Sequence, residues 1–194
     1  MCGIVGYVGH RPVQEVLLAG LEKLEYRGYD SAGISMQSDG QLDSVRAVGN
    51  LSALRAAVDT VDEENGAGGV AVAAPPATTG IGHTRWATHG RVTEENAHPH
   101  FDQDNRVHIV VNGIVENYME LKDELLARGA EFTSETDVEV MAHLIAQQLD
   151  ETGEEDVLCR SLSDVADDAA HGRASFRREL RRAEAQPWTP HVRS

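Results

Sequence analysis

The chain has 194 residues, the length of one domain, and its 41% hydrophobic content suits a globular protein rather than a disordered one. Its formal net charge of -15 gives a surface that repels nucleic acid and anionic lipid, so neither is expected as a partner. No apolar run approaches the roughly 18 residues that a membrane span needs, and the N-terminus lacks the positive flank of a signal peptide, so we expect a cytoplasmic protein.

Strand and helix patterns alternate along the first half of the chain. A short apolar, β-prone run predicts a buried strand at residues 3–8, and a stripe of apolar residues predicts a helix from Pro12 to about Glu25. Further strands are predicted at residues 32–36, 44–48, 81–84 and 107–111, with a short helix around residues 51–58. The stretch 62–79 is acidic and then rich in Gly, Ala, Pro and Thr, which predicts a surface insertion.

Two helices are predicted after the last strand, at about residues 117–128 and 137–149. Thr136 and Glu139 have the spacing of a capping box at the start of the second one. The mixture of elements indicates an α+β protein.

The composition changes after about residue 157. Seven of the chain's fifteen arginines lie between Arg160 and Arg193, and apolar periodicity is almost absent there. Either a solvated basic tail, with a short helix near residues 176–184, or a sequence that has lost its reading frame would give this pattern. We therefore divide the chain into a domain at 1–157 and an atypical Arg-rich tail at 158–194.

Cys2 directly follows the initiator methionine, and its small size permits removal of Met1. The exposed residue would then hold both a thiol and an α-amine, whose ordinary pKa of about 7.7–8.0 allows it to take the thiol proton. A small buried cysteine at the start of a strand is the favoured interpretation from this residue alone. With Cys159 so far along the chain, neither a disulfide framework nor metal ligation by cysteine is expected.

The segment His83-Thr-Arg-Trp-Ala-Thr-His-Gly90 brings a guanidinium, an indole, two hydroxyls and two imidazoles together where a strand ends. Loops with this content seldom serve packing alone. Arg85 could bind a free carboxylate through paired hydrogen bonds, and Trp86 could supply an apolar wall. The alternative is a surface loop in which Arg85 forms a salt bridge.

Asn112-Gly113 follows a strand of buried type, where a side-chain amide and a backbone N–H could together stabilise an oxyanion. On spacing alone, a hairpin turn is the favoured interpretation of Asn-Gly. Asp137 is open to two interpretations: a first-turn acid favoured by the helix dipole, or the partner of a substrate ammonium.

Arg27 and Asp30 stand together in a turn before a small-residue strand, where they could brace the N-terminus or pair with each other; we favour bracing. The segment 96–100 holds two histidines around a proline without a matching acidic cluster, so a structural or substrate-gating role is expected. No metal and no cofactor are predicted.

Six segments in this order closely resemble the glucosamine-6-phosphate synthase family, whose members are glutamine--fructose-6-phosphate aminotransferases. They are residues 2–6, 26–33, 83–90, 96–100, 112–117 and 134–137. Their Arg-Gly-Tyr-Asp and Arg-Trp-Ala-Thr-His forms are more similar to this family than to amidophosphoribosyltransferase or glutamine-dependent asparagine synthetase. The resemblance implies an N-terminal-nucleophile hydrolase fold, a four-layer αββα sandwich, and a class II glutamine amidotransferase reaction.

The same resemblance implies roles for individual residues. Cys2 would attack the side-chain amide of glutamine with its α-amine shuttling the proton, and Asn112 with the Gly113 N–H would hold the oxyanion. The expected substrate-binding residues are Arg85 and Thr88 for the α-carboxylate, Asp137 for the α-ammonium, and Trp86 and His89 for the pocket wall. Arg27 would steady Cys2. In the full-length enzyme the ammonia would serve conversion of fructose 6-phosphate to glucosamine 6-phosphate.

The chain departs from the family pattern in two places. Val111 stands where the family commonly has a histidine before Asn-Gly. After residue 157 neither the remaining strands of the domain nor the sugar-isomerase module that binds fructose 6-phosphate follows, so we expect an incomplete fold; the full-length enzyme could be a homodimer. Two other interpretations stay open: a non-catalytic glutaminase-like relic or binding protein, and the glutaminase domain of another class II amidotransferase.

Overall fold

The computed structural model describes residues 2–38, 40–66, 76–87 and 90–152. The chain divides into two units, Met1–Ala146 and Gln147–Ser194, and every residue that lines the site belongs to the first. The predicted Arg-rich tail lies outside the described residues, as do residues 67–75 of the predicted insertion and the predicted pocket residues Thr88 and His89.

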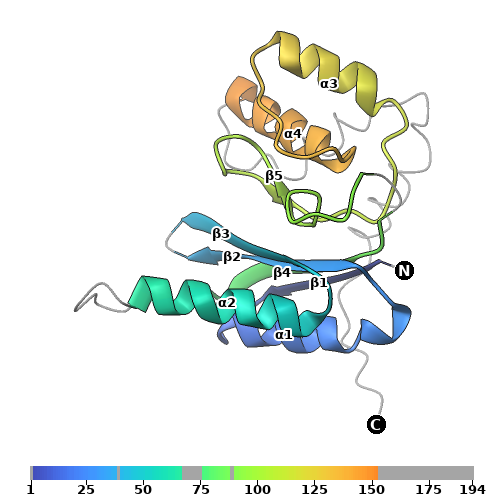
Figure 1. The fold of residues 1–194 in the computed structure, drawn as a ribbon. Coiled ribbons are helices and arrows are strands. Elements are labelled where there is room, and N and C mark those ends of the chain that lie inside the picture. The colour runs from blue at the N-terminus through green and yellow to red at the C-terminus, as the bar shows by residue number, and fades with distance from the viewer. Residues whose placement is uncertain (1, 39, 67–75, 88–89, 153–194) are drawn as a thin grey trace, which may run out of the picture. The chain divides into compact units, whose positions relative to one another are not determined.

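Within the described part of the chain, four antiparallel strands form the main sheet in the order β1-β4-β2-β3 (Figure 1). The strands are β1 (Gly3–Val8), β2 (Ser31–Ser38), β3 (Gln41–Val48) and β4 (Thr79–Arg85). The four strands predicted here from the sequence are confirmed, three of them with longer ends. The first and last of these four strands along the chain, β1 and β4, pair with each other, so Cys2 lies beside the end of β4.

Helices α1 (Val13–Glu22) and α2 (Leu51–Gly66) cover one face of this sheet (Figure 1). Their apolar stripes pack on Ile34 of β2 to form the main core, in which Leu17 and Leu54 are fully buried. Each such side chain contributes about 1.5–3 kcal/mol to folding when it leaves water.

Two predictions for this helical layer were wrong in extent. The predicted first helix ends at Glu22, and a separate 3₁₀ turn, η1 (Glu25–Arg27), follows it. The second helix was predicted to be short, but its backbone continues through Gly66, into the predicted insertion. The side chains at residues 59–61 are exposed, so the helix leaves the core after Val58.

A second, small sheet packs on the other face of β2 and β3. It consists, among the residues described, of the antiparallel pair β5 (His100–Phe101) and β6 (His108–Ile109). Ser35 Oγ of β2 and His108 Nδ1 are 2.7 Å apart, and the Asn105 side-chain amide donates to the Leu42 carbonyl at 2.8 Å.

The strand predicted at residues 107–111 was wrong in length, and β5 was not predicted. Beyond Ile109 the chain leaves the ladder, and two of its polar groups contact buried histidines. The Val111 N–H donates to His98 Nδ1 at 3.5 Å, and Asn112 Oδ1 lies 2.7 Å from His83 Nε2. The alternation of apolar and polar residues in the sequence does not reveal that the strand ends at Ile109.

Gly33 allows the segment that leads into β5 to lie directly against the main sheet. A Cβ at this position would be 2.2 Å from the His98 carbonyl oxygen and 2.9 Å from the Val45 carbonyl oxygen. Gly33 pairs with His83 across β2 and β4, so the close approach also brings the His98 ring onto the His83 ring.

Helices α3 (Tyr118–Ala127) and α4 (Val138–Thr152) confirm the two helices predicted in this region. Figure 1 places β5 between the main sheet and the start of α4, so the first unit runs helix, sheet, sheet, helix as an N-terminal-nucleophile hydrolase fold does. None of the described helices is long and apolar enough to cross a membrane.

The capping box predicted at the start of α4 was wrong. The Glu139 carboxylate accepts hydrogen bonds from the N–H and hydroxyl groups of Thr133 and Ser134, at 2.6 to 2.9 Å. Thr136 Oγ1 lies instead 3.0 Å from His100 Nε2. Glu139 therefore holds the loop that precedes the helix rather than its N-cap residue.

Candidate active site

The face of β4 that points away from α1 carries the first part of the site. Gly82 faces Leu21 of α1, so His83 and Arg85, one and three residues further along the strand, point to the opposite face of the sheet. Ile4 of β1 pairs with His83, and Cys2, two residues earlier, shares that face. The sheet therefore places Cys2 on the same face as a buried imidazole and a buried guanidinium.

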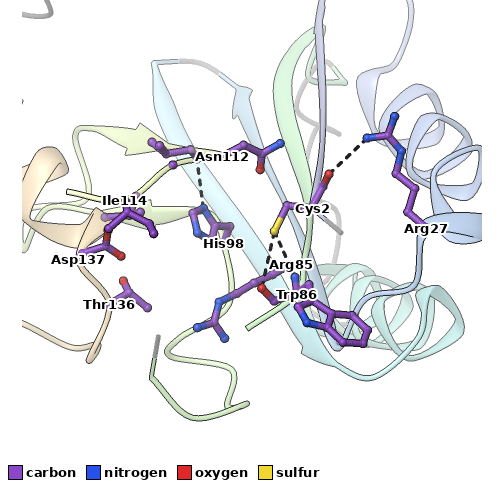
Figure 2. Close-up of a pocket in the computed structure, with 12 residues that line it drawn as sticks. Cys2, Arg27, Arg85, Trp86, His98, Asn112, Ile114, Thr136 and Asp137 are labelled. Atoms are coloured by element: carbon purple, nitrogen blue, oxygen red, sulfur yellow. Dashed lines mark hydrogen bonds between the residues drawn. The ribbon is translucent and has the colours of Figure 1, made fainter. Parts of the chain in front are cut away.

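A pocket of about 580 Å³ opens over this face, within the ~300–1,000 Å³ that small-molecule sites usually enclose (Figure 2). Its lining residues are Cys2, Arg27, Arg85, Trp86, His98, Val111, Asn112, Gly113, Ile114, Thr136, Asp137 and Val138. All seven described residues that the sequence assigned to a site are among them. They come from the residue before β1, from η1, from the end of β4 and the residue after it, from the segment after β6, and from the residue before α4.

The thiol of Cys2 lies at the end of β4. The Trp86 N–H donates to Cys2 Sγ at 3.3 Å, and Cys2 Sγ lies 3.7 Å from the Trp86 carbonyl oxygen. Arg27 Nη1 donates to the Cys2 carbonyl at 3.5 Å, a contact of the kind that the bracing hypothesis requires. Asp30 accepts from the Ala87 N–H and the Ser31 hydroxyl, so it fastens the loop after β4 to the start of β2.

Asn112 and Gly113 do not form a hairpin turn, and that interpretation of the Asn-Gly pair was wrong. They lie between β6 and α3, while residues 102–107 connect the two strands of the small sheet. The Asn112 side chain is fixed at its oxygen, since Asn112 Oδ1 lies 2.7 Å from His83 Nε2.

Two opposite charges face the same pocket. Arg85, 5% exposed, donates from Nη1 to the Arg91 carbonyl at 3.3 Å. Asp137, 6% exposed, accepts at Oδ2 from the Val115 N–H at 2.7 Å. Asp137 also directly precedes α4, so both interpretations of this residue, helix-terminal acid and pocket acid, describe its position. In Figure 2 it approaches from the side opposite Cys2 and Trp86.

Three buried histidines lie against the pocket. The rings of His83 and His98 stack with centroids 4.1 Å apart, and His98 meets the edge of His100 at 4.6 Å. Burial lowers the pKa of His83 to about 4 and the pKa of His100 to about 3, and it lowers the pKa of His98 as well. All three are therefore neutral near pH 7.

Sequence reasoning gave no individual site role to His83, which lies beneath the pocket, or to several lining residues, among them His98 and Thr136. For His83 a signal was present: it stands two residues before Arg85 on a predicted strand, and so on the same face. Across the described ranges, no three His, Cys, Asp or Glu side chains are grouped so as to hold a metal ion.

Residues 66–158 match the family model described as glutamine amidotransferase domain. The chain is 54% identical over 152 residues to glutamine--fructose-6-phosphate aminotransferase [isomerizing] of Thermosynechococcus vestitus, an alignment that covers 78% of this chain and 22% of that protein. The chain carries a glutamine amidotransferase domain. The protein of the same name from Thermus thermophilus is 52% identical over 76% of this chain and 22% of its own length. The chain thus spans about a fifth of these curated relatives.

Solved structures support the fold of the amidotransferase domain. The allosteric regulatory enzyme of purine biosynthesis has a TM-score of 0.61 and 25% identity, covering 84% of this chain and 33% of that one. Glutamine phosphoribosylpyrophosphate (PRPP) amidotransferase from B. subtilis, complexed with ADP and GMP, has a TM-score of 0.56 and 27% identity, with coverage of 84% and 32%. The N-terminal-nucleophile hydrolase fold expected from the sequence is confirmed.

Proposed function

We propose that this chain hydrolyses the side-chain amide of glutamine to glutamate and ammonia. The observation that carries the proposal is the composition of one pocket: a thiol directly before β1, a side-chain amide and a backbone N–H after β6, and a guanidinium and a carboxylate at its wall. The two charged groups are complementary to the α-carboxylate and α-ammonium of an amino acid.

The reaction would begin with Cys2 as the N-terminal residue, after removal of Met1. The α-amine takes the thiol proton, and the thiolate adds to the amide carbon of glutamine. The resulting oxyanion accepts hydrogen bonds from the Asn112 amide and the Gly113 N–H. When the intermediate collapses, the C–N bond breaks, the proton held by the α-amine passes to nitrogen, and ammonia leaves a thioester. Water then hydrolyses the thioester, which releases glutamate and restores the thiol.

The substrate would be held through its charged end. Arg85 binds the α-carboxylate and Asp137 the α-ammonium, while Trp86 covers the chain of methylenes between them and the amide. Thr88 and His89, which the resemblance also assigns to the pocket, would complete it from the loop after Trp86. Arg27 would keep Cys2 in place through its hydrogen bond to the Cys2 carbonyl.

For the longer protein, we infer that the ammonia serves the conversion of fructose 6-phosphate to glucosamine 6-phosphate. The support is the name and 50–55% identity of the relatives, combined with the fact that the chain spans only about 22% of their length. The sugar would bind to an isomerase module outside this domain, in the same chain or in a separate subunit, in a cytoplasmic enzyme that could be a homodimer. Alternatively, the ammonia is transferred to the acceptor of another class II amidotransferase.

Glutamate release from glutamine tests the proposed hydrolysis. Mass spectrometry first establishes that the purified protein begins at Cys2. We expect glutamate release from this protein and a loss of at least about 1,000-fold in Cys2→Ala, because no other group in the pocket replaces the thiolate. Thermal unfolding of both proteins confirms that they are equally folded. Folded protein without Cys2-dependent release contradicts the proposal, and a glutamine-dependent rise in melting temperature would then indicate a binding protein.

A further inference from the structure

His83 has no role in the reaction described so far, although it is 1% exposed and contacts Asn112, which lines the pocket. Its Nε2 atom is 2.7 Å from Asn112 Oδ1. We propose that His83 is a positioning residue: its Nε2–H donates to Asn112 Oδ1 and so directs the Asn112 NH₂ group at the oxyanion. The inference rests on the proposed glutamine hydrolysis.

The direction of this hydrogen bond follows from the two groups. The oxygen of a side-chain amide only accepts hydrogen bonds, so the proton between the two atoms belongs to His83 Nε2. A side-chain amide is planar, and its NH₂ group points away from its oxygen. Once Oδ1 is held by His83, rotation of the Asn112 side chain is restricted and the NH₂ group is left for a ligand.

Asn112 needs such an anchor because its own backbone provides little. The residue lies between β6 and α3, outside any helix or strand, and its side chain is at the rim of the pocket. Without the hydrogen bond, the amide could turn its oxygen toward the pocket, where an acceptor would repel the oxyanion. The energetic value of an oxyanion donor depends on its being oriented before the reaction begins.

His83, in contrast, is held by its backbone and by one face of its ring, while its Nδ1 atom is buried without a hydrogen-bond partner. It pairs with Ile4 of β1 and Gly33 of β2 in the centre of the main sheet. The His98 ring stacks on it at 4.1 Å with an interplanar angle of 20°. The lowered pKa of His83 keeps the ring neutral near pH 7, so a single N–H is available and its position matters. Sites supported from regular strands in this way are more exact than sites held by loops alone.

Three single variants separate positioning from packing. His83→Leu removes the donor and leaves an apolar side chain, whereas His83→Gln retains an N–H donor. We expect kcat for glutamate release to fall about 10- to 100-fold in His83→Leu with KM changed less than about twofold, because the oxyanion develops only as the thiolate adds and is absent from the bound substrate. His83→Gln should keep kcat within about fivefold of the starting protein. His143→Leu, a buried histidine outside the pocket, is the matched control and should keep the original kcat.

Coupling to Asn112 provides the second readout. If His83 acts through Asn112, then His83→Leu should change kcat less than about twofold when Asn112→Ala is already present. Independent, multiplicative losses in the double mutant would overturn the proposal. So would a rise in KM at constant kcat, or a His83→Gln variant as slow as His83→Leu.

The ¹⁵N chemical shifts of the His83 ring test the same assignment without activity. We expect the proton on Nε2; a ring that carries it on Nδ1 alone overturns the proposal. This measurement decides the matter if His83→Leu fails to fold. It also separates the two proposals: a protein without Cys2-dependent glutamate release contradicts the proposed hydrolysis, while the location of the ring proton still reports on His83.

Discussion

Asp137 is the pocket residue whose charge can be removed with the smallest change of shape. Its Oδ2 accepts a hydrogen bond from the Val115 N–H at 2.7 Å, and an asparagine oxygen can accept the same bond. Asp137→Asn should therefore fold normally but lose the charge proposed to bind the substrate ammonium. Because a charge-assisted hydrogen bond is worth about 1–2 kcal/mol more than a neutral one, we expect KM for glutamine to rise roughly 10-fold with a smaller change in kcat.

Steady-state kinetics of glutamate release measure this effect. Asp123→Asn is the matched control, since it removes the same charge from an exposed position of α3 and should leave KM unchanged. An Asp137→Asn protein with unaltered KM would show that Asp137 serves only as an acid at the start of α4.

The residues of the site differ in how far the sequence could assign them. Cys2 by itself favoured core packing and gained its meaning from motifs that lie more than 80 residues away, which the pairing of β1 with β4 brings together. Asn112-Gly113 favoured a hairpin turn, because the local preference of Asn-Gly does not reveal that a buried histidine holds the asparagine oxygen. Local patterns identify such residues, but their partners are set by tertiary structure.

The packing of the segment before β5 against the main sheet depends on the absence of a side chain at Gly33. A Cβ at Gly33 would meet two backbone carbonyl oxygens, of His98 and Val45, at 2.2 and 2.9 Å, and neither can move without shifting a strand or the segment before β5. We expect Gly33→Ala to lower the free energy of unfolding by about 1–3 kcal/mol, the range typical of overpacking. Urea denaturation measures the change.

Gly6→Ala is the control for Gly33→Ala. It lies in the same sheet, in β1, and a Cβ there has no atom within 4 Å. Since alanine restricts the unfolded chain more than glycine does, this variant should be neutral or slightly more stable. Equal effects of the two substitutions would mean that the close approach of the His98 backbone contributes nothing to stability.

The loop before α4 depends on the carboxylate of Glu139. Each of its oxygens accepts two hydrogen bonds, one pair from Thr133 and one from Ser134. In Glu139→Gln, an NH₂ group replaces one oxygen. That NH₂ group is itself a donor, so it cannot accept the hydrogen bonds from Thr133 or Ser134. We expect a loss of roughly 3 kcal/mol in unfolding free energy, about two hydrogen bonds to a charged group. Glu124→Gln, at an exposed position of α3, is the control; a loss as large there would contradict this account.

Helices and strands with a continuous apolar face were predicted well, and those without one were predicted poorly. The strands and helices that bury a continuous apolar face, such as β1 and α1, follow from periodicity. The pair β5–β6 has two residues in each strand, too few for any period, and residues 59–61 of α2 are exposed and give no apolar signal. The resemblance to a family indicated the layered fold, although the pattern alone indicated only a mixture of helices and strands.

For the molecule as a whole, acid should be destabilising through its buried histidines. His83 and His100 have pKa values of about 4 and 3 in the folded protein, against the ordinary value of 6.5. Between these values the unfolded chain binds protons that the folded chain does not, so stability falls as the pH decreases from about 6.5 toward 4. At pH 5 we expect each of the two histidines to lower the free energy of unfolding by about 2 kcal/mol relative to pH 7.

Urea denaturation at pH 7, 6 and 5 measures this loss, and a single variant assigns it. Protonation of carboxylates reduces the repulsion within a chain of net charge -15, which opposes the effect of the histidines. The comparison must therefore be made between proteins of nearly equal charge. His100→Gln keeps a polar group opposite Thr136 Oγ1 but does not titrate, so its stability should decline less between pH 7 and 5 than that of the starting protein, by about 2 kcal/mol. Parallel pH profiles of the two proteins would show that His100 titrates alike in the folded and unfolded chains.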